Sequence, residues 1–269
     1  MSSRYHQRKY LIDKIRSLPQ NAKVLDIGGW FDPLMLATHV VDLLPYETRN
    51  CKLSLKMNEG EKFSGDTWHQ AEFLDPNLRL PYPDKFFDFV VCSHTLEDLE
   101  EPVYLLNEIK RLSKAGYIEV PSRLDEQTLG IRDRASTSSG HPHHHWIIDM
   151  SEKSLIFYSK KASLSKDGWQ IPLMFTESLS KSNPYAGILE FYFQDSFSFT
   201  SVPDHDPISL KKSIQFAESL NIPKLLFVED SVVRFGRRLK NRFLNKPVDY
   251  TWYKNIVELS RPYSSIPLK

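Results

Sequence analysis

The sequence has little cysteine and no long apolar segment. Its 269 residues include two cysteines, Cys51 and Cys92, which excludes a disulfide-stapled secreted domain and a four-cysteine zinc site. No apolar run approaches the roughly 20 residues that span a bilayer. The first ten residues lack the apolar core of a secretory signal peptide. With 41% hydrophobic and 26% charged residues, the composition is that of an ordinary globular protein, for which we expect a cytoplasmic location.

Charge is balanced in total but unevenly distributed. The formal net charge is +1, yet residues 231–269 carry nine Lys and Arg against two Asp and Glu. A basic tail on a mildly acidic body suits an anionic partner, although solvated basic helices are also common. Nucleic acid is not an expected partner, because the body is acidic and no basic platform rich in aromatic residues occurs.

The first half of the sequence alternates short apolar segments with helical patterns. We predict strands in the apolar run before Gly28 and at His39–Asp42, Phe86–Cys92 and Tyr117–Val120. Helical spacing of apolar residues covers 5–18 and 102–113, whereas 48–70 gives no clear signal. This alternation predicts an α/β fold with a doubly wound, mostly parallel, Rossmann-like sheet.

The pattern changes after about residue 124. Residues 125–142 are rich in Ser, Thr, Arg, Gly and Pro and predict a long loop. Strand-like segments follow at Trp146–Ile148, Ser154–Tyr158, Ile188–Phe193 and Phe197–Val202, and helices are predicted near 208–220 and 230–244. In the last helix an apolar stripe is formed by Val232, Phe235, Leu239 and Phe243. We therefore predict a core at 1–150 and a β-rich and helical extension at 151–269.

Two strand ends carry the residues expected to bind a cofactor. In an open parallel sheet, ligands bind beyond the carboxyl ends of the strands, and here one strand ends at Asp26 before Gly28 and Gly29. Asp42 ends the next strand, where a carboxylate accepts hydrogen bonds from a ribose diol. Asp42 follows Gly28 by fewer residues than the roughly 20 of nicotinamide enzymes, and Pro33 has no amide for a diphosphate. These features favour S-adenosylmethionine over NAD.

The motifs together resemble class I S-adenosylmethionine-dependent methyltransferases. The resemblance covers roughly residues 20–150. It rests on the order of the segments Val24-Leu-Asp-Ile-Gly-Gly29, Val40-Val-Asp-Leu43, Phe87-Asp-Phe-Val-Val-Cys-Ser-His-Thr-Leu-Glu-Asp98, Leu106-Asn-Glu-Ile-Lys-Arg-Leu112 and Lys114-Ala-Gly-Tyr-Ile-Glu-Val-Pro121. This chain departs from the family where Trp30 replaces a third glycine, where Asp98 replaces a more frequent His, and where position 72 is Glu rather than Asp.

The resemblance implies a role for each matching residue. Asp26, Gly28 and Gly29 would surround the amino-acid end of the cofactor, and Asp42 would hold the ribose hydroxyls. Glu72 and Phe73 would contact the adenine. Ser93 and His94 would lie beside the sulfonium, where His94 either acts on the acceptor or packs over the cofactor.

A histidine-rich segment, Gly140-His-Pro-His-His-His-Trp146, allows three interpretations. The first is a metal site, and the second is an active-site wall that supplies a base. The third is a polar loop whose histidines satisfy backbone groups. The resemblance favours His143 and His144 as residues of the active site, with no metal.

We therefore expect methyl transfer to a hydroxyl or amine of a small-molecule or glycan-type acceptor. One of the histidines would serve as general base, and the extension would cap the acceptor site. The basic tail would suit a phosphate-bearing acceptor. The alternatives are a methyltransferase-like scaffold protein without turnover and a nicotinamide-dependent oxidoreductase.

Overall fold

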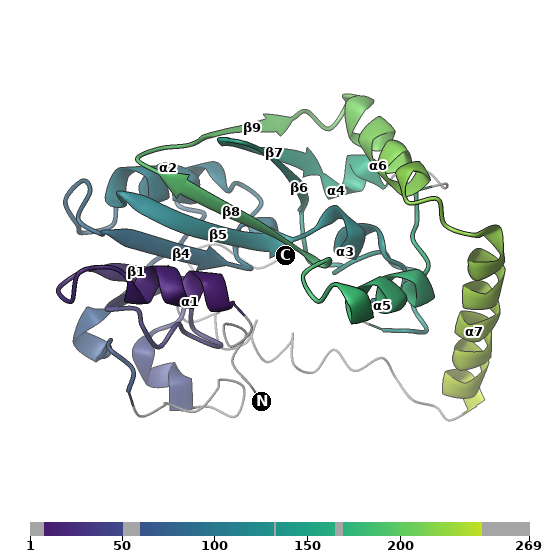
Figure 1. The fold of residues 1–269 in the computed structure, drawn as a ribbon, viewed down its shortest axis with the longest axis horizontal. Coiled ribbons are helices and arrows are strands. Elements are labelled where there is room, and N and C mark those ends of the chain that lie inside the picture. Colours follow the sequence, from purple (N-terminus) through teal and green to yellow (C-terminus); the bar gives the residue numbers. More distant parts are fainter. Residues whose placement is uncertain (1–7, 51–59, 132, 165–168, 244–269) are drawn as a thin grey trace. The chain divides into compact units, whose positions relative to one another are not determined.

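The computed structural model describes residues 8–50, 60–131, 133–164 and 169–243 (Figure 1). The chain divides into two compact units. The first contains Met1–Glu119, Glu190–Phe197 and Tyr250–Lys269, and the second contains Val120–Leu189 and Ser198–Asp249. Cys51, the start of the predicted N-terminal helix and the basic residues beyond 243 lie outside the described residues.

The first unit is built on a six-stranded sheet in the order β3-β2-β1-β4-β5-β8. Its strands are β1 (Val24–Ile27), β2 (His39–Asp42), β3 (Trp68–Gln70), β4 (Phe89–Ser93), β5 (Ala115–Pro121) and β8 (Ile188–Gln194). β1 runs parallel to both β2 and β4, and Asp26 lies opposite Val40 on one side and Val91 on the other. The pairs β2–β3 and β4–β5 are also parallel. Strands buried on both faces explain why β1 and β4 are almost continuously apolar.

Two helices accompany this sheet, α1 (Lys9–Arg16) and α2 (Val103–Leu112). The apolar residues Leu11 and Ile15 of α1 are buried in a core that also holds Val24, Val40 and Tyr117. Short 3-10 turns occupy η2 (Tyr46–Asn50), η3 (Gly65–Thr67) and η4 (Leu96–Asp98). The described link between β1 and β2 contains no helix, so the loop after Gly28 is shaped by side-chain contacts.

Most predicted elements of the first half are confirmed, with two differences. β3 was not predicted, because its three residues follow a polar segment and only Trp68 is buried. β8 was assigned to the extension, but it joins the main sheet beside β5. The first segment of the first unit therefore ends at Glu119, whereas the predicted boundary was residue 150. The later segment Glu190–Phe197 also belongs to this unit.

The second unit contains a three-stranded sheet in the order β6-β7-β9. Its elements are α3 (Arg123–Gln127), β6 (Trp146–Ser151), β7 (Ser154–Ser159), α4 (Lys160–Ser163), α5 (Leu173–Ser182), β9 (Ser198–Val202), α6 (Ile208–Ser219) and α7 (Lys224–Phe243). β6 and β7 form an antiparallel hairpin, and β7 pairs in parallel with β9. The predicted loop at 125–142 begins inside α3, and α5 was not predicted.

No described helix is both long enough and apolar enough to span a membrane.

Candidate functional site

The strand order of the first unit reverses between β1 and β4. β1 continues to β2 on one side, whereas β4 lies on its other side and continues to β5. In open α/β sheets, ligands bind beyond the carboxyl ends of the strands at such a switch point. The residues to consider are therefore those that follow Ile27, Asp42 and Ser93.

A glycine turn follows β1 and lies against the segment that follows β4. Gly28 has a φ of +73°, in the left-handed region that favours glycine. A Cβ at Gly28 would lie 2.0 Å from Thr95 Oγ1, so the missing side chain leaves room for Thr95. The Gly28 amide donates to the Val41 carbonyl at 2.9 Å. The first loop is therefore locked against the segment that follows β4.

Asp26 shapes this loop from inside the protein. Its carboxylate is fully buried, and Oδ2 accepts a hydrogen bond from the Leu34 amide at 2.7 Å. A Cβ at Gly29 would lie 2.5 Å from the same oxygen. The expected contact of Asp26 with the cofactor stays a prediction, and Asp26 holds the loop through the Leu34 amide. The physical reason is that the loop after β1 lacks a helix, and Asp26 satisfies one of its amides.

Asp42 ends β2 beside the same loop. Its Oδ2 accepts from the Trp30 amide at 3.0 Å, and its Oδ1 accepts from the Leu44 amide at 2.9 Å. A carboxylate oxygen has two lone pairs and can accept more than one hydrogen bond. The two amide contacts fix the orientation of the carboxylate, which is 8% exposed.

The other expected cofactor residues are placed at the ends of β3 and β4. Glu72 is half-buried and Phe73 is buried, and both follow β3, which the Ala71 amide ties to the Asp42 carbonyl at 2.9 Å. Ser93 is fully buried, and its hydroxyl donates to Glu119 Oε1 at 3.1 Å. Ser93 therefore supports the neighbouring carboxylate and offers no surface to a ligand in this structure.

His94 lies between two carboxylates. Its Nδ1 is 3.2 Å from Glu97 Oε1, and its Nε2 is 3.1 Å from Glu119 Oε1. The residue has a φ of +52°, an uncommon conformation for a non-glycine residue. Glu119 also pairs with Arg8 and accepts a hydrogen bond from the Tyr117 hydroxyl. This network of charges joins the end of β4 to the end of β5.

These contacts decide which groups are charged. Burial by itself would lower the pKa of His94, but the hydrogen bonds with Glu119 and Glu97 outweigh it and raise the pKa to about 9. Burial would raise the pKa of Glu119, but hydrogen bonds from His94 and Arg8 hold that pKa well below its usual range. At neutral pH the site therefore holds the His94 imidazolium beside the Glu119 carboxylate.

The expected role of His94 as a general base requires the imidazole to lose its proton first. A base must offer a free nitrogen lone pair, whereas an imidazolium donates from both nitrogens. Both expected roles of His94, acting on the acceptor and packing over the cofactor, stay predictions.

Glu97 was not singled out by the sequence. It is 1% exposed, and its Oε2 has no hydrogen-bond partner among the described residues. A buried carboxylate oxygen without a donor is costly unless a ligand supplies one. The spacing of three residues from His94, in a chain turning after a strand, is the signal that could have identified Glu97.

His143 and His144 belong to the second unit, together with Glu126, Asp125 and His141. Their predicted catalytic role is therefore not tested by the geometry of the first unit and stays a prediction. Arg123, also of the second unit, pairs with Asp149 and is a structural residue.

The comparisons with known proteins agree with this site. Residues 28–118 match a family model described as a methyltransferase domain. No curated protein matches the sequence significantly.

Solved structures give more distant matches. A complex of the Haloferax volcanii Trm112 methyltransferase activator with a methyltransferase is 14% identical, covers 71% of this chain and 89% of that chain, and has a TM-score of 0.39. A methyltransferase from Aquifex aeolicus is 18% identical, covers 44% and 65%, and has a TM-score of 0.28. One from Mesorhizobium loti is 17% identical, covers 43% and 56%, and has a TM-score of 0.29. The chain spans less than two thirds of the length of the last two, and matches at these scores do not establish a fold or a function.

The parallel sheet and its switch point form a Rossmann-like methyltransferase fold. Residues 28–118 form a class I S-adenosylmethionine-dependent methyltransferase domain, and S-adenosylmethionine is its cofactor. The residues present fit this group, because the cofactor carries an ammonium and a sulfonium cation and the site holds the buried, incompletely paired carboxylate of Glu97.

Proposed function

We propose that the chain transfers the methyl group of S-adenosylmethionine to a hydroxyl or amine of a small molecule or glycan-type acceptor. The observation that carries this proposal is the convergence of Asp42, the Gly28 turn and Glu97 at the carboxyl ends of β1, β2 and β4. An acid at the end of β2 suits a ribose diol, and a buried acid after β4 suits a cationic ligand. Nucleic acid is not the proposed acceptor.

When bound, the cofactor supplies a methyl carbon activated by a positive sulfur. The chain's own residues have two tasks in such a reaction, which are to hold the acceptor nucleophile in line and, for a hydroxyl, to remove its proton. Asp42 would hold the ribose hydroxyls, and Glu97 would face the positive charge of the cofactor. Protonated His94 would position Glu97 and Glu119 and so keep the site in shape.

Two arginines of the basic helix α7 make contacts within the second unit. Arg234 pairs with Asp230, and Arg238 Nε donates to the Ala135 carbonyl at 2.8 Å. The anionic acceptor stays a prediction.

Calorimetric titration with S-adenosylmethionine and S-adenosylhomocysteine tests the cofactor site. We expect Asp42→Asn to weaken both ligands about tenfold or more, since it removes charge where the ribose would lie. Glu97→Gln should weaken S-adenosylmethionine more than S-adenosylhomocysteine, because the latter lacks the sulfonium charge. Asp98→Asn, at an exposed neighbouring acid, is the matched control and should leave both affinities unchanged.

Transfer of a labelled methyl group to a panel of small hydroxyl, amine and glycan acceptors tests the reaction. Formation of S-adenosylhomocysteine that depends on one acceptor class supports the proposal. Tight cofactor binding with no transfer to any of them would favour the scaffold protein instead. Transfer to RNA or DNA in preference to small acceptors would overturn the proposed acceptor class.

A further inference from the structure

Three histidines of the second unit lie close together in one turn. The donor nitrogens of His141, His143 and His144 all lie within 4.8 Å of one another. The His144 ring centroid is 4.6 Å from that of His141 and 4.6 Å from that of His143. The His144 amide donates to the His141 carbonyl at 3.2 Å, which closes the turn through Pro142. The segment thus gathers three imidazoles in one turn.

Backbone contacts hold this turn in place. Gly140 has a φ of +55°, and a Cβ there would lie 2.8 Å from the backbone of Glu126. Its amide donates to the Thr128 carbonyl at 2.9 Å, and the Lys160 amide donates to the His145 carbonyl at 2.8 Å. The turn is therefore anchored on both sides, as a preorganised ligand set requires.

Two carboxylates contact the imidazoles. The nearly inaccessible Glu126 pairs with Nδ1 of His144, and Asp125 Oδ2 is 3.3 Å from Nε2 of His141. Histidines that bind a metal generally donate from the other ring nitrogen to a carboxylate, which fixes the tautomer and the ring orientation. Lys160 also pairs with Glu126.

We propose that His141, His143 and His144 form a binding site for a divalent transition-metal ion of the zinc type. Glu126 and Asp125 orient His144 and His141, which bind through Nε2 and Nδ1 respectively. Three imidazoles and one open position suit Zn²⁺, and an imidazole set also accepts Co²⁺ as a spectroscopic probe. This site lies within the second unit and does not depend on the proposed methyl transfer.

Titration of the chelator-treated full chain with Zn²⁺ alone tests the site. We expect one Zn²⁺ per chain, with affinity lowered about tenfold or more in His143→Gln and by roughly ten- to a hundredfold in Glu126→Gln. His145→Gln is the matched control, because this neighbouring histidine is exposed and outside the cluster. Co²⁺ should give the visible spectrum of a tetrahedral site.

Either of two results would overturn the proposal. One is wild-type protein that takes up no Zn²⁺, and the other is His143→Gln that binds Zn²⁺ as tightly as His145→Gln does. Circular dichroism of each variant distinguishes loss of the site from loss of the fold.

An independent observation concerns α7, which uses polar side chains to contact the rest of the second unit. Asp230 is 3% exposed, pairs with Arg234 and accepts from the Met174 amide of α5 at 3.5 Å. Arg238 donates to the Ala135 carbonyl. An amphipathic helix normally buries its apolar stripe. Here the hydrogen bonds of Asp230 and Arg238 join α7 to the rest of the second unit.

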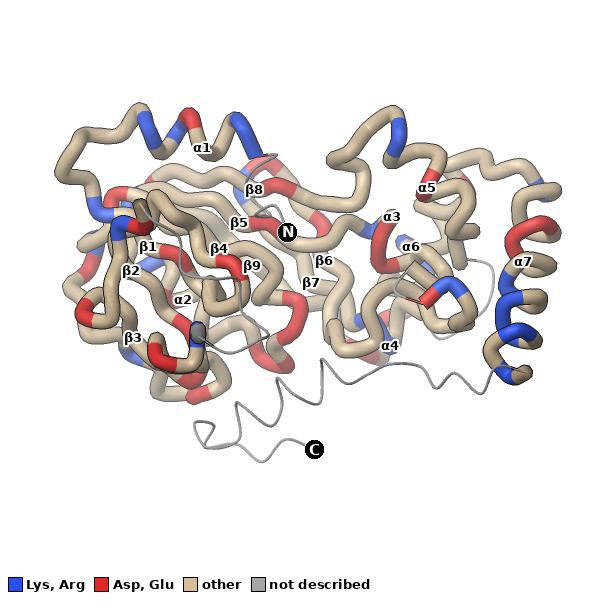
Figure 2. The backbone as a smooth tube through the Cα atoms, turned by 90° about the horizontal axis from the view of Figure 1, so that it is seen from below, with Lys and Arg blue, Asp and Glu red and all other residues tan. Residues whose placement is uncertain are grey.

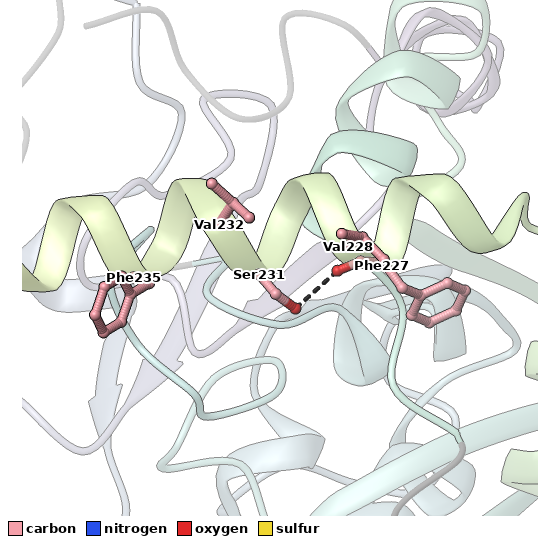
Figure 3. A pocket seen from close by; sticks show the side chains of 5 residues that line it. All are labelled: Phe227, Val228, Ser231, Val232 and Phe235. Carbon is pink, nitrogen blue, oxygen red and sulfur yellow. Dashed lines mark hydrogen bonds between the residues drawn. The ribbon is translucent and has the colours of Figure 1, made fainter.

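The apolar stripe of α7 is exposed instead. Its residues follow one another at three- and four-residue spacing and are Leu225, Val228, Val232, Phe235, Leu239 and Phe243, with exposures from 40% to 83%. Figure 3 shows the side chains of Val228, Val232 and Phe235 projecting from the helix, where they line a shallow pocket with Phe227. A contiguous exposed apolar face of this kind marks a docking surface.

The charge around the stripe indicates what docks there. Lys224, Lys240 and Arg242 are exposed, whereas Glu229 is the one exposed acid among the residues of this helix. Figure 2 shows a basic position at the start of α7, acidic positions after it and further basic positions towards the end of the helix. A second copy would bring like charges together, but an anionic surface would complement them. We propose that α7 lies in the interface of an anionic lipid bilayer, with its stripe in the acyl region.

Sedimentation of the full chain with lipid vesicles tests this proposal. We expect binding to phosphatidylcholine vesicles that contain phosphatidylserine, weaker binding to phosphatidylcholine alone, and loss of binding at high salt. Phe235→Gln with Leu239→Gln should weaken binding about tenfold or more. Met150→Gln, at an exposed apolar residue of β6, is the control and should bind normally.

Absence of vesicle binding would overturn the lipid proposal. If the chain then forms dimers in size-exclusion chromatography, and the double Gln variant abolishes them, the occupant of the stripe is a second copy. Helicity measured by circular dichroism confirms that the variants keep α7.

Discussion

At the scale of single residues, the site depends on small features that let two loops meet. Gly28 accepts a left-handed conformation and leaves room for Thr95, while Asp26 fills the space beside Gly29. His94 carries its charge because two acids surround it. Each of these residues acts on its neighbours, and the ligand-facing role that we propose belongs to Asp42 and Glu97.

The Gly28 turn gives a stability prediction. Gly28→Ala should destabilise the protein by more than about 2 kcal/mol, because the left-handed conformation costs an alanine about 1–2 kcal/mol and its Cβ overlaps Thr95. In a Thr95→Ala background the cost should fall, since the overlap with Oγ1 is removed. Gly236→Ala is the control, because a Cβ there meets no atom within 4 Å. Urea denaturation measures all three, and a neutral Gly28→Ala would contradict the described turn.

His94 gives a pH prediction. Its folded pKa of about 9 exceeds its ordinary value of 6.5, so its stabilisation is complete below pH 6.5 and is lost as the pH rises towards 9. The folded pKa of Glu119 is depressed, so its contribution is present above its ordinary value of 4.5 and is lost as the pH falls below it.

The free energy of unfolding of wild type should therefore exceed that of His94→Gln most between these two ordinary pKa values. The difference should shrink above pH 7 and vanish above pH 9. Denaturation at several pH values measures it. A difference that grows with pH would show that His94 is neutral in the folded protein.

At the scale of elements, buried ion pairs hold the second unit together. Arg123 of α3 makes two hydrogen bonds to Asp149 of β6, at 3.0 and 2.8 Å, and one to Ser213 of α6 at 3.0 Å. Its side chain is 6% exposed. One guanidinium therefore connects three elements of the second unit.

Arg123→Ala should lower the stability by about 3 kcal/mol, because it leaves Asp149 without its partner. The control is Arg134→Ala, which removes a solvent-exposed ion pair with Glu177 and should cost less than about 1 kcal/mol. Thermal unfolding compares the two variants. Equal losses of stability in the two variants would mean that burial of the Arg123 ion pair adds nothing to its contribution.

At the scale of the whole molecule, cofactor binding should be visible as stability. A ligand that binds only the folded state adds about 2.7 kcal/mol at a hundredfold excess over its Kd. S-adenosylhomocysteine should therefore raise the unfolding temperature of wild type and, at the same concentration, raise that of Asp42→Asn much less. An equal rise in the two proteins would place the ribose away from Asp42.

The sequence by itself determined the parallel α/β sheet, the order of the first strands and the class of cofactor. Those properties depend on local signals, which are apolar runs, glycine turns and an acid after a strand. The strands β1, β2, β4 and β5 were found in this way, whereas β3 was missed because its residues carry no pattern.

Only the tertiary structure decided which way the side chains face. It turned Asp26 inward, surrounded His94 with Glu97 and Glu119, joined β8 to the main sheet and exposed the apolar stripe of α7. The physical reason is that charge state and burial depend on partners distant in sequence. Glu119 meets Arg8 across 111 positions of the chain, and no local pattern carries that information.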